Sequence, residues 1–180
     1  MNVKKLIAWP LWVGFLACMI QVVDQALIGI VSEPIAKADA GLSWVAFQSW
    51  ACYFLAGCTP KGGLLVFISY ITGTLGSIAI ILLGTGAFSG IGFMAVPLAV
   101  GVIAFCVMFF EHIPLLSLIP ALFVASGAYF ALMNFAGAPL MAMGGNMFMQ
   151  AFKVEMIYAV LGIVFGVITI AGKGVIDSKL

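Results

Sequence analysis

The chain contains no arginine and a single histidine, and charged residues make up 7% of its 180 residues. A soluble protein carries charge over its whole surface, and about a quarter of its residues are charged. Seven lysines and six acids cannot cover a soluble chain of this length. The lack of charge therefore excludes a soluble globular protein, and the 65% of residues that are apolar indicate lipid as the solvent.

Clustered positive charge is missing as well, which bears on the partners of the chain. A surface that binds nucleic acid needs groups of Lys and Arg, and the net charge here is only +1. The stretch from Thr59 to Gly63 lacks the spacing of a phosphate-binding loop, so we expect no step driven by ATP. The partners that we expect are the lipid bilayer and a small-molecule solute, and no nucleic acid.

Metal ligands and catalytic groups are sparse. The single histidine, His112, has no second imidazole to work with, and no Cys-x-x-Cys pair or Cys/His cluster suggests zinc or iron–sulfur. The cysteines fall inside or at the ends of apolar runs, where they serve as small packing residues and not as disulfides. They are Cys18, Cys52, Cys58 and Cys106. Because no Ser–His arrangement and no paired intramembrane carboxylates are available, we expect no metal site, no cofactor and no enzymatic activity.

Long apolar runs dominate what is present. A helix rises about 1.5 Å per residue, so about 20 mostly apolar residues cross a bilayer. The first run continues past Cys18, and we interpret it as a retained span and not as a cleaved signal peptide. Six crossings are expected, the second of them short: Leu6 to Val23, Leu42 to Gly57, Leu64 to Leu83, Ile91 to Phe110, Leu115 to Phe135 and Val154 to Ala171. The expected fold is a single all-α integral membrane domain over residues 1–180.

Lysines near the ends of these runs predict the orientation, because cytoplasmic loops carry an excess of Lys. With the N-terminus inside, the cytoplasmic side collects Lys4, Lys5, Lys61, Lys173 and Lys179, and the outer side has Lys37 and Lys153. Both termini are therefore expected in the cytoplasm. Of the breaks between runs, only Ala136 to Lys153, on the outer side, is long enough to hold structure of its own.

Six crossings divide into three plus three. An odd number per half inverts the second half relative to the first, a design that many transporters use to place a site at the midplane. The second and fifth runs share the patterns Cys52-Tyr53-Phe54 and Ala128-Tyr129-Phe130, and the third and sixth carry closely spaced glycines. These patterns are compatible with an inverted repeat and do not decide it.

Two segments carry a family resemblance. The first contains Ser43-Trp44, Phe47, Cys52, Tyr53-Phe54 and Cys58-Thr59-Pro60-Lys61-Gly62-Gly63, and the second contains Leu115-Leu116-Ser117, Pro120 and Phe123. Both resemble family 1097 of the domains of unknown function, which are small bacterial inner-membrane proteins. The chain departs from that family in a longer, Met-rich segment before the sixth run. The resemblance implies the topology and a bacterial inner-membrane location, and it supplies no activity.

Polar side chains gather in the outer half of the expected bundle. Gln21, Asp24 and Gln25 share one face at the outer end of the first run, since residues three and four apart are neighbours on a helix. The other members are Gln48, Asn134 and Glu155. Facing lipid would cost each of these groups several kcal/mol, so one interpretation is a vestibule that binds a small polar solute. The other is that water and lipid headgroups already wet them.

Two further groups have both a functional and a structural interpretation. Phe47, Trp50, Tyr53 and Phe54 could form an aromatic constriction below the vestibule, or they could be simple packing. The turn made by Cys58, Thr59, Pro60, Gly62 and Gly63 could line an inner mouth where a helix stops midway, or be a tight connector.

A methionine array and an acid–histidine pair also stay open. Met141, Met143, Met147 and Met149 lie in the outer break, where thioethers could load Cu(I) into a pore or fill gaps between helices. Glu111 and His112 could relay protons on the cytoplasmic side, or be a solvated helix end.

These features favour a channel or facilitated transporter for a small polar, uncharged solute such as urea or a short amide. The alternatives are a copper permease that uses the Met-rich segment and a structural membrane subunit that transports nothing. Because a chain this small often needs copies of itself to shield polar surface, we expect a homo-oligomer.

Overall fold

The computed structural model describes residues 3–32, 34–35 and 41–179, and the regular structure of these residues is helical. Among them, five helical segments are long and apolar enough to cross a bilayer. They are α1 (Val3–Val31), α4 (Pro60–Leu82) with a π-helical extension to Ala87, α5 (Ala95–Met108) with short 3-10 segments on both sides, α6 (Ile119–Ala142) and α7 (Met147–Lys179). The expected all-helical membrane fold is confirmed. Lys37, one of the two lysines expected on the outer side, lies outside the described residues.

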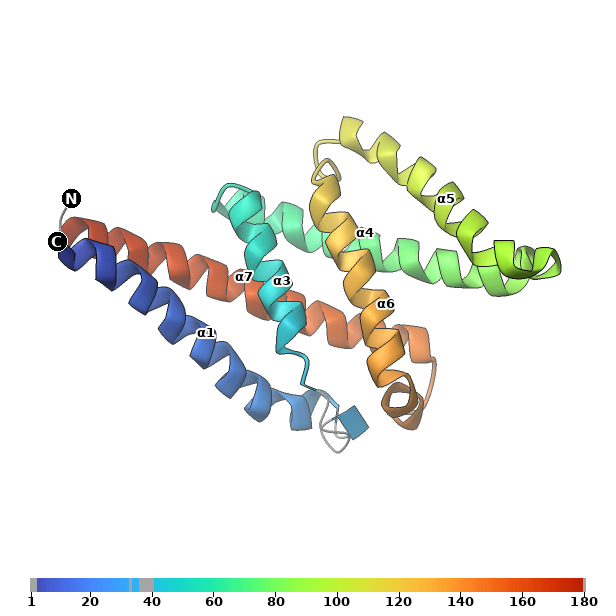
Figure 1. The fold of residues 1–180 in the computed structure, drawn as a ribbon, viewed down its shortest axis with the longest axis horizontal. Coiled ribbons are helices and arrows are strands. Elements are labelled where there is room, and N and C mark those ends of the chain that lie inside the picture. Colours follow the sequence, from blue (N-terminus) through green and yellow to red (C-terminus); the bar gives the residue numbers. More distant parts are fainter. Residues whose placement is uncertain (1–2, 33, 36–40, 180) are drawn as a thin grey trace.

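The second expected crossing corresponds to α3 (Ser43–Leu55), which has 13 residues. At about 1.5 Å per residue this helix spans about 20 Å, less than the roughly 30 Å of a hydrocarbon core. α3 is followed by a tight turn in which Gly57 and Cys58 have φ values of 86° and 58°. Figure 1 shows this turn part-way along α7, well short of the C-terminal end of α7.

The expected break between Ala136 and Lys153 is much shorter in the structure. α6 continues to Ala142 across a kink at Ala136, whose φ and ψ are −117° and 15°. The kink lies just before Pro139, which has no N–H to donate to the preceding turn. Because α7 already begins at Met147, only four residues separate the two helices. The start of the fifth crossing is also corrected, since Leu115–Leu118 belong to the connection before α6.

Two contacts between helices hold the interior together (Figure 1). In one, α3 lies across α7, and in the other, α6 lies across α4. Both contacts depend on a glycine that lets two backbones approach. A Cβ atom on Gly162 of α7 would overlap the carbonyl oxygen of Ala46 and the hydroxyl of Ser49 in α3. On α4, a Cβ atom on Gly73 would overlap the carbonyl oxygen of Leu122 in α6.

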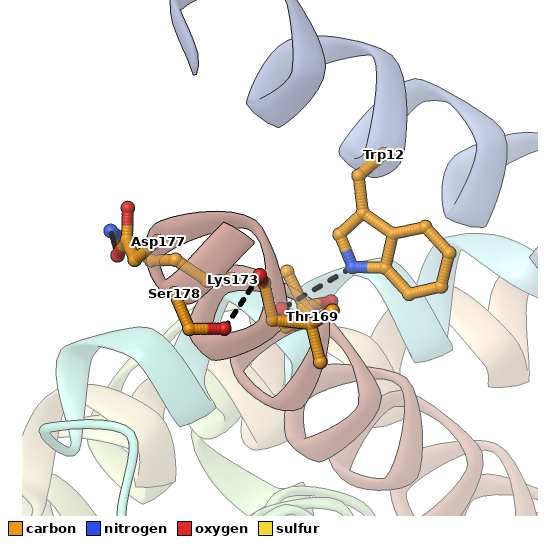
Figure 2. A network of polar contacts seen from close by, with 6 residues as sticks. Trp12, Thr169, Lys173, Asp177 and Ser178 are labelled. Carbon is orange, nitrogen blue, oxygen red and sulfur yellow. Dashed lines mark hydrogen bonds and ion pairs between the residues drawn. The ribbon is translucent and has the colours of Figure 1, made fainter. Parts of the chain in front are cut away.

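The two ends of the chain lie at the same end of the molecule, where α1 runs antiparallel to α7 (Figure 1). Figure 2 shows Trp12 of α1 reaching over α7, where its indole Nε1 donates to the carbonyl oxygen of Thr169 at 3.3 Å. The ammonium of Lys173 lies 5.5 Å from the centre of the Trp9 ring and 2.6 Å from a carboxylate oxygen of Asp177. The contacts of Trp12 with Thr169 and of Trp9 with Lys173 join the antiparallel first and last helices.

We predict that Gly162→Ala destabilises the protein by about 1–3 kcal/mol, because the added methyl group forces α3 away from α7. Gly174→Ala is the matched control on the same helix, since nothing lies within 4 Å of a Cβ atom there. The measurement is the midpoint of thermal unfolding in detergent. Equal midpoints for the two variants would show that the α3–α7 crossing is looser than described.

Candidate functional site

Six polar side chains from four helices are buried inside the bundle, and we call them the buried polar belt. All six are at most 4% exposed. The belt consists of Asp24 from α1, Tyr70 and Thr74 from α4, Tyr129 from α6, and Glu155 and Tyr158 from α7. Polar groups in the interior of a membrane protein are costly and mark functional sites by default, so this belt is the candidate site.

Asp24 is bound by backbone and side-chain donors of two other helices. Its carboxylate accepts the backbone N–H groups of Leu42 and Ser43 at 3.2 Å each. These are the first N–H groups of α3, whose own N-cap position, Leu42, offers no side-chain acceptor. The hydroxyl of Tyr158 donates to the other carboxylate oxygen at 2.5 Å. Asp24 therefore caps α3 from α1 and joins both helices to α7.

Glu155 is fully buried on α7, one turn before Tyr158. Its Oε2 atom lies 2.7 Å from the hydroxyl of Thr74 on α4. Its Oε1 atom has no hydrogen-bond partner among the described residues. Half of the acceptor capacity of this carboxyl group is therefore unused.

Two buried tyrosines of the belt come from the neighbouring helices α4 and α6. Tyr70 of α4 and Tyr129 of α6 are both close enough to interact electrostatically with Glu155. The hydroxyl of Tyr129 donates to the carbonyl oxygen of Phe148 at 3.1 Å. The hydroxyl of Tyr70 has no partner among the described residues, although a buried hydroxyl normally has one.

The amides of the expected vestibule do not join this belt. Gln21, Gln25, Gln48 and Asn134 are all exposed on the surface of the chain. Gln21 accepts the hydroxyl of Ser43 at 3.0 Å, and the amide nitrogen of Asn134 donates to a carbonyl oxygen one turn earlier in its own helix at 2.8 Å. The structure thus separates the expected set, with Asp24 and Glu155 inside and the four amides outside. Solute binding by any of them stays a prediction.

A hollow of about 330 Å³ lies close to Asp24 of the belt. It is lined by Gly41, Leu42, Trp44, Phe135 and Ala136. A Cβ atom on Gly41 would lie 3.2 Å from the carboxylate of Asp24. The hollow therefore brings the surface of the molecule close to the buried Asp24.

The aromatic side chains of α3 divide between its two faces. Trp50 and Tyr53 are 4% and 2% exposed and pack against α7, the first on Phe165 and the second on Gly166. Phe54 is 38% exposed and lies on the outside. The indole Nε1 of Trp50 is a third buried polar atom without a partner among the described residues. An aromatic constriction by these residues stays a prediction.

The turn between α3 and α4 is a tight connector. Thr59 caps α4 by accepting the backbone N–H of Gly62 at 3.0 Å, and Pro60 occupies the first helical turn. Gly62 and Gly63 are buried, and a Cβ atom on Gly62 would overlap the carbonyl oxygen of Ala56. Thr59 and Pro60 are exposed and Cys58 is half-buried, so reagents could reach the turn. An inner mouth here stays a prediction.

Two of the four methionines in the array pack against the core, and the other two are exposed. Met143 and Met147 pack against the hydrophobic core, and the sulfur of Met143 accepts the hydroxyl of Ser32 at 3.1 Å. Met141 and Met149 are exposed. Packing therefore explains half of the array.

Sequence reasoning missed four members of the belt, namely Tyr70, Thr74, Tyr129 and Tyr158. The signal was available in the tyrosines, because a tyrosine within an apolar run needs a partner for its hydroxyl. The spacing of Glu155 and Tyr158 places both on one face of a helix. The spacing alone does not say which other helix they meet.

Comparison with known proteins gives one family. The family described as "Protein of unknown function (DUF1097)" matches residues 25–173. No curated protein and no solved structure matches the chain.

We predict that Asp24→Ala lowers the free energy of unfolding by about 2–4 kcal/mol, because two backbone N–H groups and the Tyr158 hydroxyl lose their acceptor inside the bundle. Tyr158→Phe removes one donor only and should cost about 1 kcal/mol. Gln25→Ala, on the exposed face of the same helix, is the control and should stay within about 0.5 kcal/mol. Thermal unfolding in detergent orders the three variants, and a neutral Asp24→Ala would contradict the capping role.

Proposed function

Since the chain belongs to DUF1097, a family described only as being of unknown function, we propose from its own geometry that it transports a small polar, uncharged solute across the membrane. The observation that carries the proposal is the set of unpartnered polar atoms inside the bundle. They are Glu155 Oε1, the Tyr70 hydroxyl and Trp50 Nε1. Each buried polar atom without a partner costs about 1–3 kcal/mol. Function is a reason for a membrane protein to retain such groups.

The chemistry of these atoms favours a solute with both a donor and an acceptor. A carboxyl oxygen accepts a hydrogen bond, an indole N–H donates one, and a tyrosine hydroxyl does either. Urea and short amides carry N–H donors and a carbonyl acceptor on one small neutral molecule. The hollow beside Asp24 is the proposed outer entrance, with the exposed amides Gln21 and Gln48 near the same end of the bundle.

The positions of the termini support six crossings instead of five. The first and last helices are antiparallel, and their free ends lie together (Figure 1). A chain whose ends share one side of a membrane crosses it an even number of times. α3 and its turn would then complete the second crossing, with the tight connector at the cytoplasmic boundary.

An inverted repeat of three plus three helices is part of the proposal, and the turns before α4 and α7 support it. Each turn has two successive residues with positive φ, Gly57 and Cys58 before α4, and Gly144 and Gly145 before α7. Each is followed by a capping side chain. Thr59 accepts a backbone N–H of α4, and Asn146 accepts the backbone N–H of Phe148 in α7 at 2.9 Å.

The two helix crossings support the same repeat. Three residues of α3 have counterparts in α6 at the same spacing in residue number. The pairs are Ala46 and Leu122, Ser49 and Ala125, and Tyr53 and Tyr129. Ala46 and Ser49 are the residues against Gly162, and Leu122 and Ala125 are the residues against Gly73. Rotation of Figure 1 by half a turn in its plane carries α3 onto α6, α4 onto α7 and α1 onto α5 in approximate position and direction. Transporters with this symmetry place their solute site between the halves.

The location and assembly complete the proposal. We place the protein in a bacterial inner membrane with both termini in the cytoplasm, and in a homo-oligomer. The copper alternative has less support, because Met143 and Met147 already pack against the core. The alternative of a structural subunit predicts no flux and is tested by the experiment below.

Stopped-flow swelling of proteoliposomes tests the proposal with a panel of urea, formamide, glycerol, ammonium and formate. We predict that the wild-type protein accelerates the entry of urea and formamide. Trp50→Phe and Tyr70→Phe should each slow it about fivefold, the effect of losing a hydrogen bond worth about 1 kcal/mol at the barrier.

Trp12→Phe is the matched control, because its indole already bonds Thr169 between α1 and α7, away from the belt. It should leave the swelling rate unchanged. Wild-type rates that equal those of empty liposomes for every solute would refute transport and favour the structural subunit.

A topology experiment tests the six crossings separately. We predict that reporters fused to either terminus both give a cytoplasmic signal, because six crossings return the chain to its starting side. In a background without native cysteines, Ala142→Cys at the exposed end of α6 should react with a thiol reagent that cannot cross the membrane, and Ser178→Cys should not. Termini on opposite sides would establish five crossings and remove the inverted repeat.

A further inference from the structure

The two buried acids of the belt, Asp24 and Glu155, differ in how many hydrogen bonds their carboxyl oxygens make. Asp24 accepts two backbone N–H groups and the Tyr158 hydroxyl, so both of its oxygens are bound. Glu155 has one contact, to Thr74, and its Oε1 atom is free of partners among the described residues. Capping explains Asp24. It does not explain why a carboxyl group is kept at position 155.

The hydroxyl of Thr74 lies close to two oxygen atoms that can accept its hydrogen. Its oxygen lies 2.7 Å from Glu155 Oε2 and 2.7 Å from the carbonyl oxygen of Tyr70. A hydroxyl has one hydrogen, so it can donate to one of these oxygens only. If it donates to the carbonyl oxygen one turn back, as Thr often does in membrane helices, the second contact needs a hydrogen from the carboxyl group. A protonated Glu155 satisfies both contacts, and an ionised one leaves one contact without a hydrogen.

The groups that face Glu155 supply no positive charge. Tyr70 of α4 and Tyr129 of α6 are close enough to interact with it electrostatically, and Tyr158 lies one turn away on α7. Tyr158 in turn bonds Asp24 of α1, and Cys52 of α3 lies beyond Tyr70. Among the described residues, the ion pairs join Lys173 to Asp177 and His112 to Glu111, all of them exposed. No lysine or histidine of this part of the chain pairs with Glu155.

A row of polar side chains runs from Glu155 toward the hollow beside Asp24. Glu155 and Tyr158 are neighbours on one face of α7. The Tyr158 hydroxyl donates to Asp24, and Asp24 lies against Gly41, which lines the hollow. These side chains form a row from the buried carboxyl group toward the surface. A row of this kind can exchange a proton without an opening wide enough for a solute.

We propose that Glu155 binds and releases one proton in each transport cycle, so that solute movement is coupled to proton movement. In the release step, the O–H bond of the carboxylic acid breaks, the proton passes to water, and the carboxylate remains. The step involves no redox change and needs no further reactant. The coupling rests on the proposed transport function, whereas the proton-binding site itself does not.

Proteoliposomes that contain a pH-sensitive dye test the coupling. A urea gradient is imposed with no pH gradient, and swelling and internal pH are recorded together, with a protonophore added in parallel runs. The wild-type protein should change the internal pH as urea moves, and the protonophore should abolish this change. Glu155→Gln keeps the shape of the side chain and should reduce the pH change to the level of empty liposomes.

Glu111→Gln is the matched control, because it makes the same chemical change at an exposed acid. It should retain the full pH change. Urea flux without any change of internal pH in the wild-type protein would overturn the coupling and leave transport standing. A pH change that survives Glu155→Gln would overturn the assignment to this residue.

Infrared spectroscopy tests the proton site without any solute. A carboxylic acid and a carboxylate absorb at different frequencies, and the chain has only six acids. The wild-type protein at neutral pH should show a carboxylic acid band that Glu155→Gln removes and Glu111→Gln retains. Absence of that band would overturn the proton-binding site at Glu155. If the band is present but the protein moves no solute, the transport function is refuted and the proton-binding site stands.

Discussion

The fold depends on the binding of the α3 N-terminus by Asp24. A helix that begins inside a membrane bundle has N–H groups that water cannot reach, and each must find an acceptor within the protein. The residue at the start of α3, Leu42, provides none, and the carboxylate of Asp24 in α1 accepts the N–H groups of Leu42 and Ser43 instead. Tyr158 then ties the same carboxylate to α7. One side chain thereby holds the short helix against the two longest helices of the described chain.

The remaining polar groups of the interior follow from this arrangement. α3 crosses α7 at Gly162, and Tyr158 and Glu155 lie about one and two turns earlier on the same helix. The crossing of α6 over α4 at Gly73 brings Thr74 and Tyr70 into the same interior. Glycines therefore decide where the helices touch, and the polar belt lies where these contacts leave room for larger side chains. The two acids then differ because only Asp24 has a helix terminus in front of it.

Much of the fold could be predicted from the sequence. Apolar runs of about 20 residues identify membrane helices because lipid offers no other partner for the backbone. The ends of the helices were less accessible, as Ala136 to Lys153 illustrates. That segment contains Pro139 and three glycines, which are typical of a loop, and yet tertiary packing extends α6 and α7 into it. The shared pattern of Tyr53 and Tyr129 was compatible with a repeat, but it did not place Tyr53 against Gly166.

By itself, the sequence determined that this is an all-helical membrane protein, because so few charges cannot cover a soluble surface. It also identified Asp24 and Glu155 as polar groups that need a special environment. Only the tertiary structure decided which of these groups are buried. The four amides lie on the surface, whereas three tyrosines from separate runs meet the acids inside. The physical reason is that helical spacing fixes which residues share a face, and the crossing of helices fixes which faces meet.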